Sequence, residues 1–281
     1  MSNQPATTIP IAILTPDGLQ DAPYSASSLA DAVKFEPQGV YSVARTFKRV
    51  YTLMLDDHFD RMEESARLIE MPLSLDRPAV RRALRTLIDR AGFAETRFRI
   101  TVPRQAPHTV MLSLEPFVGI PPEVIQQGVR VMTAPLVREN PHAKVTSWMQ
   151  QRVSTLGQIP EGVYETLLVA PSGEILEGAS SNFWAVMDGT LHTAEEGVLN
   201  GIVRRALLHI APQMLPIKLH PIRKDELWLV EEAFLTSASR GVVPIVIIDS
   251  QIIADGKPGP NTMWLREAYD EWAAAHLEEL I

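Results

Sequence analysis

The chain has 281 residues, a net charge of -8 and no cysteine. The acidic balance argues against nucleic-acid binding, because phosphate backbones attract a basic surface. The absence of cysteine excludes disulfides, cysteine metal sites and thiol nucleophiles, and it fits a reducing compartment. No apolar stretch approaches the roughly 20 residues that a membrane span needs, and residues 1–10 lack the features of a signal peptide. These features predict a soluble, cytoplasmic, globular protein that contacts neither nucleic acid nor membrane.

The first third of the chain alternates between predicted strands and predicted helices. Short apolar or alternating runs predict strands at residues 10–15, 39–47, 50–55, 97–102 and 109–114. Apolar residues at helical spacing predict amphipathic helices over residues 57–70 and from Val80 to a stop at Gly92. Strand pairs combined with two helices predict a small N-terminal α+β domain over residues 1–118.

Prolines and glycine in residues 115–123 indicate a linker, which we place at residues 119–125. Residues 126–281 are expected to form a larger C-terminal domain that carries Lys144, so the predicted fold combines α+β and α/β parts in two domains. Its strands are expected at residues 129–133, 164–170, 182–187, 233–235 and 244–248. Its helices are expected at residues 145–156, 201–210 and, after the Pro-Gly-Pro stop at 258–260, at 261–280.

Several common catalytic motifs are absent from the sequence. There is no G-x-G-x-x-G, no P-loop and no G-x-S-x-G, and the seven histidines form no H-E-x-x-H helix. The sequence therefore indicates no nucleotide-phosphate loop, no serine hydrolase and no metal site.

One lysine stands out by its position. Lys144 precedes an apolar-striped helix, and a lysine at a helix N-terminus opposes the macrodipole, which favours a lowered pKa. A neutral amine is what Schiff-base chemistry needs. The alternative is an ordinary solvated surface lysine.

Three further segments are compatible with a phosphorylated, ring-containing ligand. Glu177 lies in an otherwise uncharged run and could face a cationic ring nitrogen, or it is an exposed turn residue. Asn200 is a plausible N-cap whose helix would offer amides to an anion. The small residues 236–241 between two strands could close over a phosphate, or they form a plain turn.

Taken together and in this order, these segments resemble the class IV, fold-type IV, pyridoxal-5'-phosphate (PLP)-dependent aminotransferase family. That family includes branched-chain and D-amino-acid aminotransferases and the aminodeoxychorismate lyases. The resemblance runs from about Gly39 to the C-terminus. It is carried by E-G-x-x-x-N from Glu177, the upstream Lys144, H-x-x-R-x-x-x-S-A from His58 and N-G-I-x-R from Asn200.

The resemblance assigns roles to individual residues. Lys144 matches the catalytic lysine that forms the Schiff base with the cofactor, and Glu177 matches the carboxylate that pairs with the pyridine nitrogen. Tyr164 matches the tyrosine that bonds the phenolic oxygen, and Arg61 matches the arginine that binds the phosphate. The remaining phosphate contacts would come from Ile202, Val203, Ser237, Ala238 and Ser239.

Two positions depart from the family pattern. The family usually has threonine at the position of Val203 and often at that of Ala238. The backbone amides survive these changes, whereas the hydroxyl hydrogen bonds do not.

The substrate-binding residues are predicted by the same resemblance. Tyr41 falls where the family places pocket residues, Arg99 falls near an arginine that binds an acidic co-substrate, and Arg240 could hold a carboxylate. Each of the two arginines could instead form a structural ion pair. Residues 20–37 depart most from the family pattern, and their role is open.

The sequence thus predicts a PLP-dependent aminotransferase that moves an amino group between a branched-chain or similar hydrophobic amino acid, or an amine, and a 2-oxo acid. One alternative is an aminodeoxychorismate lyase, which forms 4-aminobenzoate and pyruvate. Another is an inactive member of the family that acts as a binding protein. The resemblance also implies a homodimer.

Overall fold

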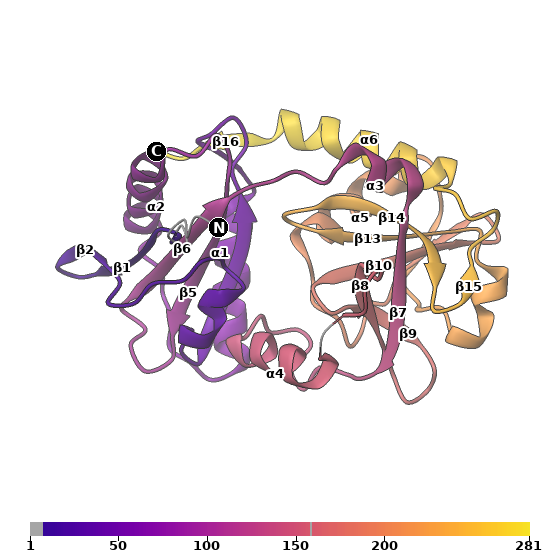
Figure 1. The fold of residues 1–281 in the computed structure, drawn as a ribbon, viewed down its shortest axis with the longest axis horizontal. Helices are drawn as coiled ribbons and strands as arrows, with labels where there is room; N and C mark the ends of the chain where they lie inside the picture. The colour runs from indigo at the N-terminus through magenta and orange to yellow at the C-terminus, as the bar shows by residue number, and fades with distance from the viewer. Residues whose placement is uncertain (1–7, 158) are drawn as a thin grey trace, which may run out of the picture. The chain divides into compact units, whose positions relative to one another are not determined.

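The structure is a computed structural model that describes residues 8–157 and 159–281. The prediction for residues 1–10 therefore lies mostly outside the described residues. Contacts group the chain into two compact units (Figure 1). The first contains the residues up to Val118, Ala143–Gln151 and His276–Ile281, and the second contains Gly119–His142 and Arg152–Ala275. Lys144 packs with the first unit although the sequence interpretation assigned it to the C-terminal domain, and the domain boundaries at 118 and 125 stay a prediction.

In the described part of the first unit, an antiparallel sheet has the strand order β2-β1-β6-β5-β3. Its strands are β1 (Ile11–Thr15), β2 (Gly18–Asp21), β3 (Gly39–Arg45), β5 (Thr96–Pro103) and β6 (Val110–Pro116). β3 pairs with β5 so that Tyr41 lies opposite Thr101 and Ser42 opposite Ile100. Since side chains alternate along a strand, Tyr41 and Ser42 point to opposite faces of the sheet.

Two helices cover one face of this sheet. Helix α1 (Leu55–Leu68) packs on β3, and α2 (Arg77–Ala91) packs on β6. The predicted apolar faces are confirmed as buried, with Phe59 and Met62 on α1 and Leu84 on α2 fully inside. The Asp76 side chain caps α2, and Gly92 ends it with φ 67°.

The predicted closing helix at residues 261–280 is too long. Helix α6 (Pro260–Ala275) ends early, and β16 (Leu277–Glu279) follows it and pairs antiparallel with β4 (Tyr51–Leu53). The apolar pattern through Leu280 is real, because Leu280 is fully buried. Leu280 directly follows β16, and its amide donates to the Val50 carbonyl. Its burial therefore comes from strand pairing and not from the face of a helix, so tertiary contacts override the helical periodicity.

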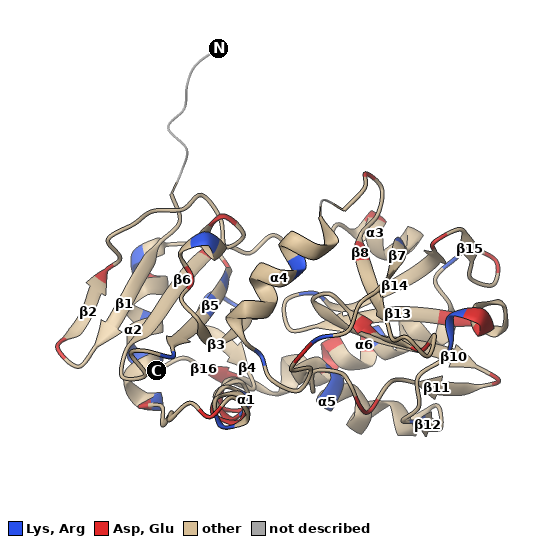
Figure 2. Cartoon of the chain, turned by 90° about the horizontal axis from the view of Figure 1, so that it is seen from below, with Lys and Arg blue, Asp and Glu red and all other residues tan. Residues whose placement is uncertain are grey.

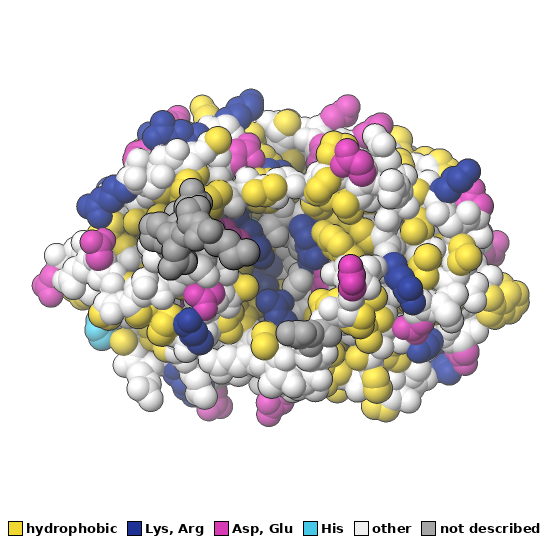
Figure 3. All heavy atoms as spheres, viewed as in Figure 1, with side chains coloured by type: hydrophobic (Ala, Val, Ile, Leu, Met, Phe, Trp, Pro, Cys, Tyr) yellow, Lys and Arg dark blue, Asp and Glu magenta, His cyan; other side chains and the backbone are white. Residues whose placement is uncertain are grey.

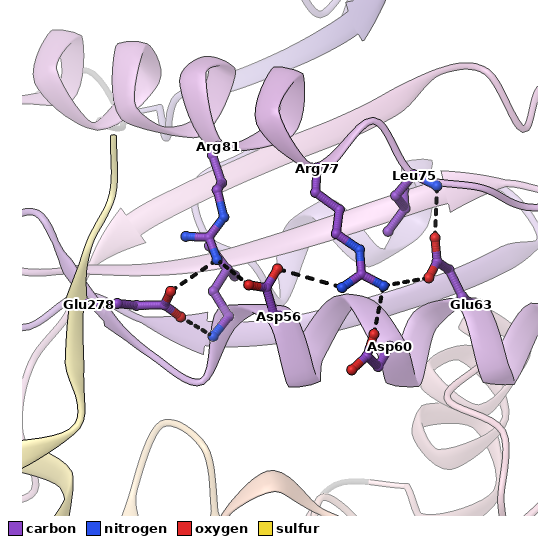
Figure 4. A network of polar contacts seen from close by, with 8 residues as sticks. Asp56, Asp60, Glu63, Leu75, Arg77, Arg81 and Glu278 are labelled. Atoms are coloured by element: carbon purple, nitrogen blue, oxygen red, sulfur yellow. Dashed lines mark hydrogen bonds and ion pairs between the residues drawn. The ribbon is translucent and has the colours of Figure 1, made fainter.

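A network of charged residues joins this terminal strand to the two helices (Figure 4). The side chain of Met54, the N-cap residue of α1, makes no capping hydrogen bond. Instead, Glu278 of β16 accepts a 2.6 Å hydrogen bond from the amide of Leu55, the first residue of α1. The same carboxylate pairs with Arg81 of α2 at 3.0 Å, and Arg81 also pairs with Asp56 of α1. Glu278 therefore supplies the missing cap of α1 from the other end of the sequence.

In the described part of the second unit, a mixed sheet has the strand order β12-β11-β10-β13-β14-β7-β8-β9, with β15 paired to β14. β9 also pairs with β10, so the strands from β10 round to β9 close into a ring. The strands are β7 (Val129–Pro135), β8 (Glu165–Val169), β9 (Ile175–Gly178), β10 (Ser181–Met187), β11 (Thr190–His192), β12 (Ile217–Lys218), β13 (Glu232–Ser237), β14 (Gly241–Ile248) and β15 (Gln251–Ile252). Helices α5 (Ile202–Ile210) and α6 pack on β13, and α6 also packs on β14.

One predicted loop is partly helical. Residues 122–127, which overlap the predicted linker, form the short helix α3 (Pro122–Gln127). Proline is tolerated in the first helical turn, where its missing amide is not needed, so the prolines here start a helix rather than prevent one. The predicted helix after Lys144 is confirmed as α4 (Thr146–Leu156).

Charged and apolar side chains mix on the surface of each unit. Basic and acidic residues are interspersed in both units (Figure 2). In the space-filling view, apolar side chains likewise alternate with charged ones (Figure 3). No helix in residues 8–157 or 159–281 is long and apolar enough to span a membrane, and no group of three or more histidine or acidic residues in those ranges could hold a metal ion.

Replacing Glu278 by alanine is expected to lower the free energy of unfolding by about 1–2 kcal/mol, because α1 loses its cap and Arg81 loses a partner. Chemical denaturation measures this loss. Glu279→Ala is the control, since Glu279 is half exposed and lies 3.6 Å from Arg85. Equal losses in the two variants would contradict the capping role.

Candidate active site

The backbone around Lys144 is bonded to β3, an edge strand of the first unit's sheet. Its carbonyl accepts a 3.0 Å hydrogen bond from the Tyr41 amide, and the next residue, Val145, bridges to Val40. The Thr146 hydroxyl accepts a 2.9 Å bond from the Gly39 amide. Lys144 Nζ lies 4.8 Å from the centre of the Tyr41 ring. The lysine is thus held at the edge of β3 with its amine over an aromatic face.

A single hydroxyl links Lys144 to Arg61. Ser65 Oγ donates to the Arg61 carbonyl at 2.6 Å and accepts from the Lys144 amide at 3.0 Å. Because Arg61 and Ser65 are one turn apart on α1, the bond from the Ser65 hydroxyl to the Arg61 carbonyl lies along the helix. Two residues that the sequence predicted for one site are therefore brought together within the first unit.

The Arg61 guanidinium is buried and oriented by two polar side chains. Arg61 Nη2 donates to Ser42 Oγ at 2.9 Å, and Ser42 Oγ lies 2.7 Å from His58 Nδ1. Arg61 is 5% exposed and His58 is 2% exposed, so this contact lies in a protected environment. Ser42 and His58 orient the guanidinium and Ser65 bonds to the Arg61 backbone, roles that the sequence did not predict.

In the second unit, the Glu177 carboxylate holds the loop that precedes α5. Glu177 is 3% exposed on β9; its Oε1 accepts from Arg138 at 3.2 Å and its Oε2 from the Leu199 amide at 3.0 Å. Asn182 Nδ2 donates to the Leu199 carbonyl at 2.7 Å. Both polar backbone groups of Leu199 are therefore held by side chains of the E-G-x-x-x-N motif.

Two glycines of the motifs are required by close packing. A Cβ at Gly178 would lie 2.2 Å from Ser181 Oγ, and a Cβ at Gly201 would lie 2.2 Å from Asn182 Oδ1. Both distances are far below any real contact of a Cβ atom. The E-G-x-x-x-N and N-G-I segments are separated in sequence, and they interlock in space.

The start of α5 offers backbone amides. Gly201 is its N-cap, and no side chain caps the helix, so Ile202 and Val203 occupy its first positions without competition from a capping group. Ser237 ends β13, and Ala238 and Ser239 lie in the turn that follows; all three are partly exposed. Ser237 Oγ accepts a 2.9 Å hydrogen bond from Arg240 Nε, so this hydroxyl has a partner within the protein.

Tyr164, Glu165 and Arg240 form a connected group. Arg240 Nη1 lies 2.6 Å from Glu165 Oε2, and the guanidinium carbon lies 5.5 Å from the Tyr164 ring centre. Burial alone would raise the pKa of the Glu165 carboxyl, but attraction to Arg240 and hydrogen bonds from Arg240 and Ser180 hold it below the usual 4.5. Burial opposes the charge of Arg240, whereas Glu165 and Tyr164 raise its pKa overall. The structure thus pairs Arg240 with the protein's own carboxylate, and its predicted contact with substrate stays a prediction.

The other two predicted substrate residues lie on one face of the first unit's sheet. Tyr41 is 4% exposed beneath the Lys144 amine, and Arg99 is 3% exposed. Arg99 Nη2 lies 2.6 Å from Glu36 Oε1. The predicted contacts of Tyr41 and Arg99 with substrate also stay predictions.

Several supporting residues escaped the sequence interpretation. Arg138, Glu165 and Glu36 form buried ion pairs with Glu177, Arg240 and Arg99 respectively. No local pattern signals such pairs, because the partners are distant in sequence. Asn182 was visible in the motif, but its hold on Leu199 required the fold.

Comparison with known proteins identifies the family. Residues 39–248 match the family model described as amino-transferase class IV, so this chain belongs to the class IV aminotransferase family. A branched-chain-amino-acid aminotransferase of Pseudomonas aeruginosa is 24% identical over 80% of this chain and 79% of its own length. A D-alanine aminotransferase of Bacillus licheniformis is 28% identical over 80% of this chain and 83% of its own length.

A solved structure supports the same fold. The crystal structure of a branched-chain amino acid aminotransferase from Escherichia coli is similar with a TM-score of 0.78 and 18% identity, over 98% of this chain and 99% of that one. Another branched-chain amino acid aminotransferase, crystallised with pyridoxamine 5'-phosphate, has a TM-score of 0.81 at 21% identity. The predictions of a fold-type IV architecture and of a PLP-dependent transaminase are confirmed. The relatives named here are transaminases, so the comparisons do not favour the lyase or the inactive binding protein.

Replacing Arg240 by methionine is expected to lower the free energy of unfolding at neutral pH by about 3 kcal/mol, because the buried Glu165 carboxylate loses its cation. In the parent protein, the depressed pKa of Glu165 contributes stability that is present above pH 4.5 and lost as the pH falls through the folded pKa. In the variant, burial is expected to raise this pKa, so the difference between the proteins should shrink below about pH 4.5.

Chemical denaturation at pH 7 and pH 4 measures both effects. Arg67→Met is the matched control, because Arg67 pairs with Glu64 on an exposed surface and should cost under about 1 kcal/mol. A pH-independent deficit in Arg240→Met would contradict the role of Glu165.

Proposed function

We propose that this transaminase transfers the amino group of a hydrophobic amino acid, or of an amine, to a 2-oxo acid, with Lys144 as its catalytic residue. The observation that carries the proposal is the buried Glu177 carboxylate bonded to the loop that leads into the uncapped start of α5. The Glu177 carboxylate, which suits a ring nitrogen, is thereby connected through this loop to the helix amides, which suit a phosphate.

The residues present fit PLP by their chemistry. A carboxylate oxygen has two lone pairs and accepts more than one hydrogen bond, so the bonds of Glu177 to Arg138 and Leu199 are compatible with a further donor. Ser181 Oγ, at the turn between β9 and β10, is buried and has no hydrogen-bond partner within residues 8–157 and 159–281. When bound, PLP supplies an aldehyde that condenses with amines and a ring that accepts electrons.

Lys144 has two tasks in this proposal. Its amine would hold the cofactor covalently, and it would also move a proton to and from the substrate α-carbon. The backbone bonds to Tyr41 and Ser65 fix the lysine at both its carbonyl and its amide. The amine can therefore travel by side-chain rotation while its backbone stays in place.

Glu177 would pair with the ring nitrogen of the bound cofactor and would hold a proton on that nitrogen. Arg138 donates to one oxygen of this carboxylate and the Leu199 amide donates to the other, so both oxygens are held in place. Tyr164 would hold the phenolic oxygen. Its side chain packs partly against the apolar core of the second unit, which limits its motion.

The phosphate would be held by charge and by backbone amides. Arg61 provides a guanidinium oriented by Ser42 and His58. The amides of Ile202 and Val203 and those of Ser237, Ala238 and Ser239 would supply the other donors. Valine and alanine at two of these positions leave the amides in place, so the proposal relies on backbone rather than on hydroxyl groups.

The hydrophobic substrate class is supported by Tyr41 and by the relatives. The Tyr41 ring forms the surface beneath the Lys144 amine, and an aromatic face suits an apolar side chain. The relatives are named for branched-chain amino acids and for D-alanine. A homodimer and a cytoplasmic location are further parts of this proposal; sedimentation analysis of the purified protein tests the first.

Reduction of the purified enzyme with borohydride should leave the cofactor on the peptide that contains Lys144, as mass mapping would show. Lys144→Met should lower turnover by at least about a hundredfold, because both covalent holding and proton transfer are lost. Lys34→Met, at an exposed lysine of the same unit, should keep normal turnover. Cofactor trapped on another lysine would overturn the proposal.

Glu177→Gln should lower kcat by about a hundredfold and affect cofactor binding much less, because the ring loses its proton while the phosphate contacts remain. Stopped assays with L-leucine, D-alanine or (R)-phenylethylamine as donor and 2-oxoglutarate or pyruvate as acceptor measure kcat and define the substrate. Glu174→Gln is the control, because this exposed carboxylate bonds to Ser172. An unchanged kcat in Glu177→Gln would contradict its role.

A further inference from the structure

A buried ion pair lies on the sheet face that carries Tyr41. In the pairing of β3 with β5, Tyr41 lies opposite Thr101 and Val43 opposite Arg99, so these four residues share one face. Arg99 is two residues from Thr101, a distance of roughly 7 Å along the strand. The Lys144 amine stands over Tyr41. Arg99 therefore shares a sheet face with the tyrosine ring that lies beneath the Lys144 amine.

This guanidinium is held by the protein itself. Arg99 Nη2 lies 2.6 Å from Glu36 Oε1, with the two side chains 4% and 2% exposed. Arg99 Nη1 donates to the Leu29 carbonyl at 2.9 Å. Glu36 and Leu29 belong to the segment at residues 20–37, for which the sequence suggested no role. Residues 20–37 thus supply the Glu36 carboxylate as the ion-pair partner of Arg99.

The surroundings of the pair contain buried polar atoms without hydrogen bonds. Within the described residues these atoms include Glu36 Oε2, Arg99 Nε, Tyr24 Oη and Thr101 Oγ1; Arg99 Nη2 also makes no hydrogen bond by angle, although it lies within ion-pair distance of Glu36. Burial, reinforced by the charge of Glu36, raises the pKa of Tyr24 to about 12, so its phenol stays neutral. We call Tyr24, Glu36, Arg99 and Thr101 the Glu36 cluster.

Stability alone is a poor explanation for the Glu36 cluster. Buried polar atoms are nearly always hydrogen-bonded in native proteins, and a buried ion pair often gains no more than its desolvation costs. An arginine on this face would otherwise attract any carboxylate that reached it. The Glu36 carboxylate is therefore better explained by the carboxylate ligands that it keeps away from Arg99.

We propose that Glu36 determines specificity by occupying Arg99, so that this side of the site rejects substrates with a second carboxylate. The proposal rests on the proposed function, and it narrows the substrates to monocarboxylic amino acids and monocarboxylic 2-oxo acids. A substrate with an acidic side chain meets the Glu36 carboxylate and an arginine whose charge is already balanced. Arg99 is then a partner of Glu36 and not a contact for an acidic co-substrate.

Equilibrium binding of two simple acids to the holoenzyme tests the proposal. By calorimetry, the parent enzyme should bind glutarate no more tightly than butyrate. Glu36→Gln removes the internal carboxylate and should bind glutarate at least about tenfold more tightly than the parent, with butyrate unchanged. The rate ratio of 2-oxoglutarate to 2-oxobutyrate as acceptor should rise by a similar factor.

Two variants isolate the cause. Glu64→Gln makes the same change in net charge at an exposed pair with Arg67 and should leave glutarate binding unchanged. The double variant Glu36→Gln with Arg99→Met removes the freed guanidinium and should lose the gain in glutarate binding.

Either of two results would overturn the proposal: a parent enzyme that binds glutarate tenfold more tightly than butyrate, or a folded Glu36→Gln variant with unchanged glutarate binding. The first needs no variant, so the test survives if Glu36→Gln does not fold. If no donor supports transamination, the proposed function fails, whereas glutarate binding still decides the role of Glu36.

Discussion

The second unit depends on the hold that two side chains exert on one residue, Leu199. Glu177 takes its amide and Asn182 takes its carbonyl, and the adjacent glycines leave no room for larger side chains. Because the backbone before α5 is fixed in this way, the first amides of the helix have a defined position relative to the carboxylate. The motif therefore has a structural role, which is to fix the backbone before α5 relative to the Glu177 carboxylate.

The first unit uses the same device with a single hydroxyl. Ser65 joins the backbone of Arg61 to that of Lys144, while Ser42 and His58 orient the guanidinium. In the first unit, two serine side chains hold the groups that would do the chemistry. This order costs little entropy, since a short side chain loses little conformational freedom when it is fixed.

Local periodicity predicted the longer strands and helices of both units, because those patterns report burial directly. It did not predict the short strands β2, β11, β12 and β15. It misjudged the segment after Ala275, where a strand buries Leu280, and residues 122–127, where prolines begin a helix. The family resemblance identified Lys144, Arg61 and Glu177 as candidates. It could not reveal Arg138, Glu165 or Glu36, because a buried ion pair between distant residues leaves no spacing in the sequence. Such pairs also decide whether an arginine is available to a substrate, as Arg99 and Arg240 illustrate.

The way the first unit is assembled from separate segments has a consequence for its biogenesis. Its last strand pairs with β4, and Glu278 caps a helix whose first residue lies 223 positions earlier. During synthesis Glu278 leaves the ribosome 223 residues after Leu55, so the segments of the first unit that precede the second unit stay incomplete until the second unit has emerged. Long-range pairing of this kind slows folding, and chaperones should therefore be needed chiefly for these segments.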